Sequence, residues 1–285
     1  MDETTATLDR SWHLKIGRAK EHFSVLDTEI KAWVLTNPVT ITREKDRVGL
    51  RHSIFAEVIN PPPLNRWSLV CGDLIHNLRS ALDSILYGIA ICETGVNPPA
   101  DEEVLQFPIT GSPPKFSKQK YRIKSLSPAV QAAIESVQPY NRPHPQHPPV
   151  LELLGYLNNF DKHRTINVIA AVPHDPSVEM DSSVASVTVY RTAVEGKTEI
   201  LSFTLALPDP DFRYKFEAMI VIYIAHLPGP SKSPFSELAS VLDSLIAEVE
   251  KVVDTLEAIV GEINIVQTPA LSQAAHFVID ESRLS

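Results

Sequence analysis

The sequence predicts an α+β fold, in which a core of long helices lies beside a mainly antiparallel sheet of about six strands. Apolar residues recur every three to four positions in several long stretches, which is typical of amphipathic helices. Shorter runs rich in β-branched residues, separated by turn-forming residues, indicate strands. The expected core helices span residues 8–34, 66–92, 150–165 and 234–260.

The first part of the chain predicts a helix, a hairpin and a second helix. Residues 8–34 carry an apolar stripe at helical spacing, while 39–42 and 50–59 alternate as paired strands do. Consecutive prolines at 61–63 end the hairpin, because proline cannot donate to a strand ladder. They deliver the chain to helix 66–92.

The middle of the chain is rich in proline and predicts loops with one short helix. We expect that helix at 128–137, a solvated basic segment at 115–124, and an extended proline-dense segment at 139–149. The last segment holds His144 and His147. It has no acidic or thiol partner nearby, so a loop is favoured over a metal site.

The remainder predicts the rest of the sheet and a closing helix. The expected strands are 166–172, 184–191, 199–207 and 214–225. Ser233 and Pro234 would cap a helix at 234–260, whose apolar stripe is either a core face or the seam of a homodimer. We predict a single α+β domain over 1–260 and a C-terminal tail over 261–285.

Composition narrows the class of protein. A hydrophobic content of 44% is sufficient for a buried core, and the net charge of −9 disfavours a large nucleic-acid surface. Cys71 and Cys92 are the only cysteines and lie too far apart along one helix to form a disulfide, which fits a reducing compartment. The N-terminus lacks a basic segment followed by an apolar run, and the apolar windows fall short of the ~20 residues of a membrane span. We therefore expect a soluble cytoplasmic protein.

Helix 66–92 carries a polar patch on one arc of its middle. In helical projection the patch covers roughly 160°. Its members, in order across the arc, are Arg79, Asp83, His76, Ser80, Asp73, Ser84 and Asn77. The same arc is apolar before and after the patch. A surface helix would be polar along its whole outer face, so the pattern predicts a buried helix with a polar site in its middle.

Helix 150–165 repeats this pattern. Asp161 and Arg164 project into the middle of its apolar arc, so two charges should face the core. The other polar residues divide between the borders of the arc, with Asn158 and His163, and its outer side, with Asn159 and Lys162. Burying the two charges costs several kcal/mol each unless they are paired and hydrogen-bonded.

Two interpretations of these patches are open. In a structural network, Asp161 or Asp83 accepts hydrogen bonds from Arg79 or Arg164. In an active site, the two helices converge on a cleft whose ionisable groups have perturbed pKa values. The whole set holds more ionisable groups than a fold usually needs, which favours the active site.

The two patches also carry a resemblance. Residues 76–83 (HNLRSALD) and 157–164 (LNNFDKHR) resemble an uncharacterised bacterial family, mainly actinobacterial, that shares HNLRSALDH and LNNxDKHR motifs. The resemblance extends to residues 19–22 of the first helix and covers much of the chain. These motifs mark the family and imply no particular activity.

A more distant likeness is to HEPN domains, helical modules whose RNase members place arginine or another polar residue a short distance before a histidine. Asn158 and His163 keep this spacing, with asparagine in place of arginine. Arg79 is instead followed by Ser84, where the related sequences tend to have histidine. The likeness implies RNA cleavage, and it concerns the helix pair alone because HEPN domains have no sheet.

From these residues we expect an enzyme that hydrolyses by acid/base catalysis, with RNA cleavage as its HEPN-like form. A histidine would act as general base, arginines would stabilise developing negative charge, and a carboxylate would orient the histidine. The candidate catalytic residues are His76, Arg79, Asp83, Asn158, Asp161, His163 and Arg164. The candidate binding residues are His22, Asp73, Asn77 and Lys162. We expect no cofactor, and a small molecule or RNA as partner.

Two alternatives stay open. A metal-dependent hydrolase or oxygenase would use Asp73, His76, Asp161 and His163 as ligands. A non-enzymatic protein would use the arginine-rich cleft to hold an acidic small molecule or a partner. The sequence lacks Walker, GxGxxG and GxSxG motifs, which disfavours nucleotide-cofactor and α/β-hydrolase functions.

Overall fold

The computed structural model has the predicted α+β class, with six α-helices and nine strands among the residues that it describes. The described residues are 10–142, 149–166, 168–171, 177–180, 183–190, 193–194, 196–209, 212, 214–217, 221–225, 227 and 235–260.

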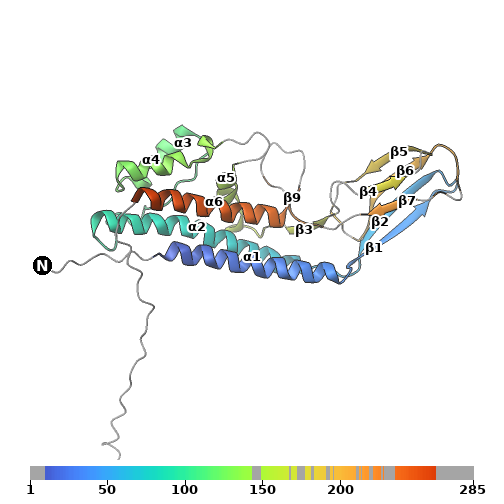
Figure 1. Ribbon diagram of the computed structural model, residues 1–285, viewed down its shortest axis with the longest axis horizontal. Helices are drawn as coiled ribbons and strands as arrows, with labels where there is room; N and C mark the ends of the chain where they lie inside the picture. Colours follow the sequence, from blue (N-terminus) through green and yellow to red (C-terminus); the bar gives the residue numbers. More distant parts are fainter. Residues whose placement is uncertain are drawn as a thin grey trace, which may run out of the picture.

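Long helices form the core of one end of the molecule (Figure 1). They are α1 (Ser11–Leu35), α2 (Leu64–Thr94), α5 (Val150–Asp161) and α6 (Leu238–Val260). α2 and α6 each pack against the other three long helices. Short elements lie over this core at the end farthest from the main sheet: α3 (Pro113–Gln119), η1 (Lys120–Ile123), α4 (Pro128–Ser136) and η2 (Pro139–Asn141).

The strands form three antiparallel sheets. The largest has the order β1 (Val39–Lys45), β2 (Arg51–Val58), β6 (Lys197–Leu205), β5 (Val184–Val189). A second sheet pairs β3 (Val168–Ala171), β8 (Val221–Ala225) and β9 (Phe235–Glu237), and a third pairs β4 (Ser177–Met180) with β7 (Tyr214–Glu217). The largest sheet extends beyond one end of the helices, whereas we expected it beside them (Figure 1).

Several predicted boundaries were wrong. α5 ends at Asp161, four residues before the predicted end at 165. α6 begins at Leu238, since the preceding residues Phe235–Glu237 pair with β8 as a strand. The run 214–225 is two strands in different sheets, β7 and β8. β4 and β9 were not predicted.

Other predictions fall outside the described residues. These are the helix cap at Ser233 and Pro234, the proline-loop histidines His144 and His147, and the tail 261–285.

The apolar stripe of α6 is part of the core. Leu242, Leu245, Val249 and Val252 are fully buried within the chain, against a cluster that includes residues of α1, α2, α4 and α5. Of the two roles open to this stripe, the structure therefore assigns it to the core.

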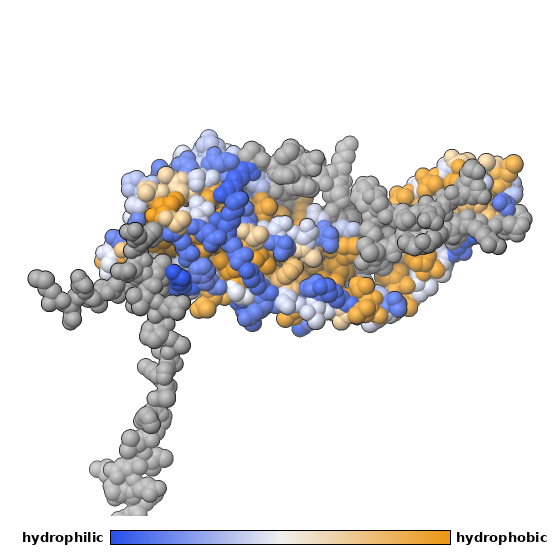
Figure 2. All heavy atoms as spheres, in the orientation of Figure 1, coloured by the Kyte–Doolittle hydropathy of each residue, from blue (hydrophilic) through white to orange (hydrophobic). Residues whose placement is uncertain are grey.

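The outer surface is mixed in character. In the face shown in Figure 2, hydrophilic side chains cross the helical end, while apolar side chains gather on the large sheet. Val187 and Val189 of β5, in this sheet, are exposed apolar residues. Within the described part of the chain, no helix is both long enough and apolar enough to cross a membrane.

A buried histidine fixes the hairpin at the far end of the sheet. His52 is fully buried and stacks on Phe203, with ring centroids 4.8 Å apart and planes at 11°. Its Nδ1 accepts a hydrogen bond from Arg43 Nε at 2.8 Å, and its Nε2 lies 3.2 Å from the Gly49 carbonyl oxygen. These partners require the neutral ring, with the proton on Nε2. Burial and the nearby cation of Arg43 lower the pKa of His52.

Replacing His52 with glutamine should remove part of the acid sensitivity of folding. Because the folded-state pKa lies below the ordinary value of 6.5, protons bind the unfolded chain first as the pH falls. The free energy of unfolding therefore decreases as the pH falls below 6.5, with a slope of at most about 1.4 kcal/mol per pH unit. Urea unfolding between about pH 7.5 and about pH 5.5 measures this loss. His163→Gln, at an exposed position after α5, should keep the wild-type slope, and an unchanged slope in His52→Gln would contradict the assignment.

Candidate functional site

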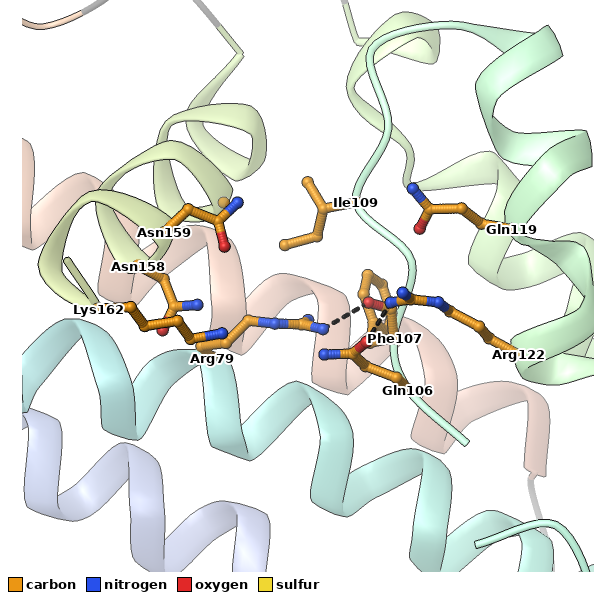
Figure 3. A pocket seen from close by; sticks show the side chains of 10 residues that line it. Arg79, Gln106, Phe107, Ile109, Gln119, Arg122, Asn158, Asn159 and Lys162 are labelled. Atoms are coloured by element: carbon orange, nitrogen blue, oxygen red, sulfur yellow. Dashed lines mark hydrogen bonds between the residues drawn. The ribbon is translucent and has the colours of Figure 1, made fainter. Parts of the chain in front are cut away.

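A polar cavity of about 310 Å³ lies between α2, α5 and the segment 106–122 (Figure 3). It is lined by Arg79, Gln106, Phe107, Ile109, Gln119, Arg122, Gly155, Asn158, Asn159 and Lys162. Three lining residues are cations, four are amides and none is a carboxylate. The cavity wall is therefore positively charged and rich in hydrogen-bonding groups.

α5 supplies one wall of the cavity with a single helical stripe. Gly155, Asn158, Asn159 and Lys162 are spaced i, i+3, i+4 and i+7, so they share one face of the helix. At Gly155, a Cβ would lie 3.3 Å from Ile109 Cγ2, so the missing side chain lets segment 106–109 approach the helix closely. We predicted that Asn159 and Lys162 face away from the apolar arc of this helix. They do, and the cavity lies on that outer side of α5.

α2 supplies the floor with a buried ion pair. Arg79 is only 9% exposed, and its Nη2 donates to the Phe107 carbonyl oxygen at 2.7 Å and lies 3.0 Å from Asp83 Oδ1. The same Asp83 oxygen accepts from the Phe107 backbone N–H at 2.8 Å. The pair thus binds both the carbonyl oxygen and the N–H of Phe107, in a segment that is not part of a sheet. Burial lowers the pKa of Arg79 and raises that of Asp83, while each group's charge opposes the shift of the other. The structural network is confirmed for this pair.

The next residues of the segment are held by Gln138. Its Oε1 accepts from the Thr110 N–H at 3.0 Å, and its Nε2 donates to the Pro108 carbonyl oxygen at 2.8 Å. Gln138 is fully buried, so these bonds replace the water that an irregular segment would otherwise need. Together with the ion pair of α2, they fix the position of the cavity wall.

The cations of the cavity lie close to one another. The guanidinium groups of Arg79 and Arg122 point toward each other in Figure 3. The positive charge of Arg122 adds to burial in lowering the pKa of Arg79. Arg122 Nη1 donates to Gln106 Oε1, and its Nε donates to the Tyr121 hydroxyl at 3.3 Å. Arg79 Nη1 is buried and has no hydrogen-bond partner among the residues that the structure describes.

Part of the polar arc of α2 serves a different contact. Lys15 Nζ donates to Ser80 Oγ at 2.7 Å and to Ser84 Oγ at 2.5 Å. This contact joins α1 to α2. The arc that we predicted as one site is therefore divided between α1, segment 106–109 and the surface.

The two predicted patches meet at Asp161, outside the cavity. A Cβ at Gly72 would lie 2.6 Å from Asp161 Oδ1, so the carboxylate rests directly on α2 at that glycine. Burial and the negative charge of Asp73 raise the pKa of Asp161, against the opposing effect of His76. Burial, with a contribution from Asp161, also raises the pKa of the Cys71 thiol to about 12. Asp73 and His76 themselves are exposed.

Several predicted site residues lie elsewhere. His163 and Arg164 are exposed beyond the end of α5, so the prediction that Arg164 faces the core was wrong. Asn77 Nδ2 donates to the Asp73 carbonyl oxygen of its own helix at 2.8 Å. His22 is half-buried on α1 and does not line the cavity.

The metal alternative gains no geometric support. In the part of the chain that the structure describes, no group of three or more histidine, cysteine, aspartate or glutamate side chains is placed to hold a metal ion. The proposed ligands Asp73, His76, Asp161 and His163 therefore do not form such a group.

Sequence reasoning missed the wall formed by segment 106–122. Gln106, Phe107, Ile109, Gln119 and Arg122 all belong to it. This region has no long periodic stretch, and the basic run at 115–124 was interpreted as solvated. The stripe Gly155, Asn158, Asn159 and Lys162 was the available signal, because polar residues at helical spacing flank a glycine there.

Comparisons with models of protein families, with curated proteins and with solved structures found no match to this chain. The resemblance to the HNLRSALDH family and the likeness to HEPN domains therefore stay predictions.

Replacing Asp83 with alanine should destabilise the protein by about 2–4 kcal/mol. The change leaves Arg79 buried without its counter-ion and the Phe107 N–H without its acceptor. The expected loss is below that of a wholly buried pair, because 33% of the Asp83 side chain is exposed. Asp83→Asn should cost less, since an amide oxygen can still accept from Phe107. Chemical denaturation measures the difference. Asp73→Ala, at an exposed carboxylate of the same helix, should change stability by less than about 0.5 kcal/mol, and an equal effect of both alanine variants would contradict the assignment.

Replacing Asp161 with asparagine should stabilise the protein at neutral pH. Its carboxylate lies beside Asp73 at the last residue of α5, where the helix dipole also disfavours negative charge. A raised folded-state pKa means that stability falls as the pH rises through that pKa, and asparagine lacks this loss. We expect a gain of under about 1 kcal/mol that disappears toward about pH 3.5. Thermal unfolding at both pH values tests this, and a variant less stable than the wild type at neutral pH would refute it.

Proposed function

We propose that this protein binds a small acidic organic molecule in the cavity between α2, α5 and segment 106–122. The convergence of Arg79, Arg122 and Lys162 from three separate elements is the observation that carries the proposal. Like charges held near one another repel, and the repulsion is relieved when an anion lies between them. No lining carboxylate performs this role.

The hydrogen bonding of Arg79 supports the same proposal. A buried N–H group without a partner costs on the order of 1–3 kcal/mol, and more when the group is charged. Arg79 Nη1 is such a group within the described residues. An anionic ligand would supply the missing acceptor, with a charge-assisted hydrogen bond.

Acid/base hydrolysis, including HEPN-like RNA cleavage, has weaker support. A general base must lie within hydrogen-bond reach of its substrate, directly or through one water. Neither His76 nor His163 lines the cavity. We therefore favour ligand binding, which we had listed as an alternative, over the hydrolytic enzyme.

Thermal unfolding in the presence of small anions tests the proposal. A ligand that binds only the folded state at about 100 times its Kd stabilises it by about 2.7 kcal/mol. We expect phosphate and malonate, compared with sodium chloride at equal ionic strength, to raise the Tm of the wild type. Arg122→Gln should abolish most of this rise.

Arg164→Gln is the matched control, because it removes the same charge at an exposed position that does not line the cavity. It should respond to the anions as the wild type does. Equal losses in both variants would indicate general charge screening, and a wild type that responds to neither anion would refute the proposed function.

A further inference from the structure

The nitrogen atoms that remain available in the cavity indicate which anion it takes. Arg79 cannot present a two-nitrogen fork, because its Nη2 is already engaged by the Phe107 carbonyl oxygen and by Asp83. Its buried Nη1 remains without a hydrogen-bond partner among the described residues. Carboxylates are typically held by arginine through two parallel N–H bonds, so Arg79 is poorly arranged for that mode.

Arg122 is restricted in a similar way. Its Nη1 donates to Gln106, and its Nε donates to the Tyr121 hydroxyl. Arg122 would therefore donate to a ligand through its Nη2. Lys162, the residue that follows α5, adds an ammonium group, which acts as a point charge with no preferred plane. Three single-point cationic donors thus approach from α2, η1 and α5 (Figure 3).

A phosphate monoester matches this arrangement. It offers three strong acceptor oxygens and carries a charge of about −1.5 to −2 at neutral pH. The three cations, less the negative charge of Asp83 beside Arg79, leave two positive charges for the ligand. Number of donors, direction and charge therefore agree with a tetrahedral dianion better than with a planar carboxylate.

The rest of the lining indicates a hydroxylated organic part. Gln106, Gln119, Asn158 and Asn159 carry amides, which both donate and accept and so suit hydroxyl groups. Only Phe107 and Ile109 are large apolar lining residues. The volume of about 310 Å³ is at the lower end of ligand pockets and corresponds to about ten water molecules, at ~30 Å³ each.

We infer that the ligand is the phosphate monoester of a small polyol or sugar, bound with its phosphate among Arg79, Arg122 and Lys162 and its hydroxyl groups against the amides of α5 and segment 106–122. This inference rests on the proposed function and specifies its ligand class.

Isothermal titration calorimetry of the full chain with chosen probes tests the inference. The probes are ribose 5-phosphate, ribose, inorganic phosphate and malonate. We expect ribose 5-phosphate to bind at least about tenfold more tightly than malonate or inorganic phosphate, and ribose not to bind. Its affinity should fall below the second phosphate pKa of about 6, where the dianion becomes a monoanion.

Variants add a second readout. Arg122→Gln and Lys162→Gln should each weaken ribose 5-phosphate binding by about tenfold or more, as expected for the loss of a charge-assisted hydrogen bond. Asn159→Ala should weaken ribose 5-phosphate and leave inorganic phosphate unchanged. Arg164→Gln should stay within about twofold of the wild type for every probe.

The outcomes separate the two proposals. Malonate binding as tightly as ribose 5-phosphate, and lost in Arg122→Gln, would overturn the phosphate assignment and retain the anion-binding function. Inorganic phosphate binding as tightly as the ester would overturn the polyol assignment. A wild type that binds none of the anions would overturn both the inference and the proposed function.

Discussion

The grip of the Arg79–Asp83 pair on Phe107 is the interaction on which the cavity depends. Arg79 donates to the carbonyl oxygen of Phe107 and Asp83 accepts from its N–H, so side chains of a helix satisfy the backbone groups that a neighbouring strand would satisfy in a sheet. Gln138 holds the following residues in the same manner. Without these bonds the wall opposite α5 would have no defined position.

The long helices of the core were predictable from the sequence, because their buried residues recur at helical spacing. The stripes of α1, α2 and α6 are repeated over many turns, and local errors do not hide such a signal. The ends of the helices and the short strands beside them were less predictable. β9 forms only because β8 lies alongside it, and a pairing partner distant in the sequence leaves no local pattern at Phe235–Glu237.

The candidate site was predicted in part, for a related reason. A helical wheel shows which residues share a face, and it correctly placed Arg79 and Asp83 on one arc. It also placed Asp161 on the side of its helix that faces the core, where the structure has it against Gly72 of α2. It cannot show what covers that face. α1 covers the serines of the arc through Lys15, and the loop covers Arg79. The polar arc, which is continuous in the sequence pattern, is therefore divided in the structure between α1, segment 106–109 and the surface.

Burying Arg79 has an electrostatic cost that its neighbours offset only in part. Arg79 Nη2 contacts both Asp83 and the Phe107 carbonyl oxygen. Its Nη1 has no hydrogen-bond partner among the described residues. Arg122 then adds a like charge where an apolar side chain would pack at lower cost. The bonds to Phe107 do not use Arg122, which instead donates to Gln106 at the start of the same segment. Under the proposed function, an anion between the two arginines would offset the repulsion between them.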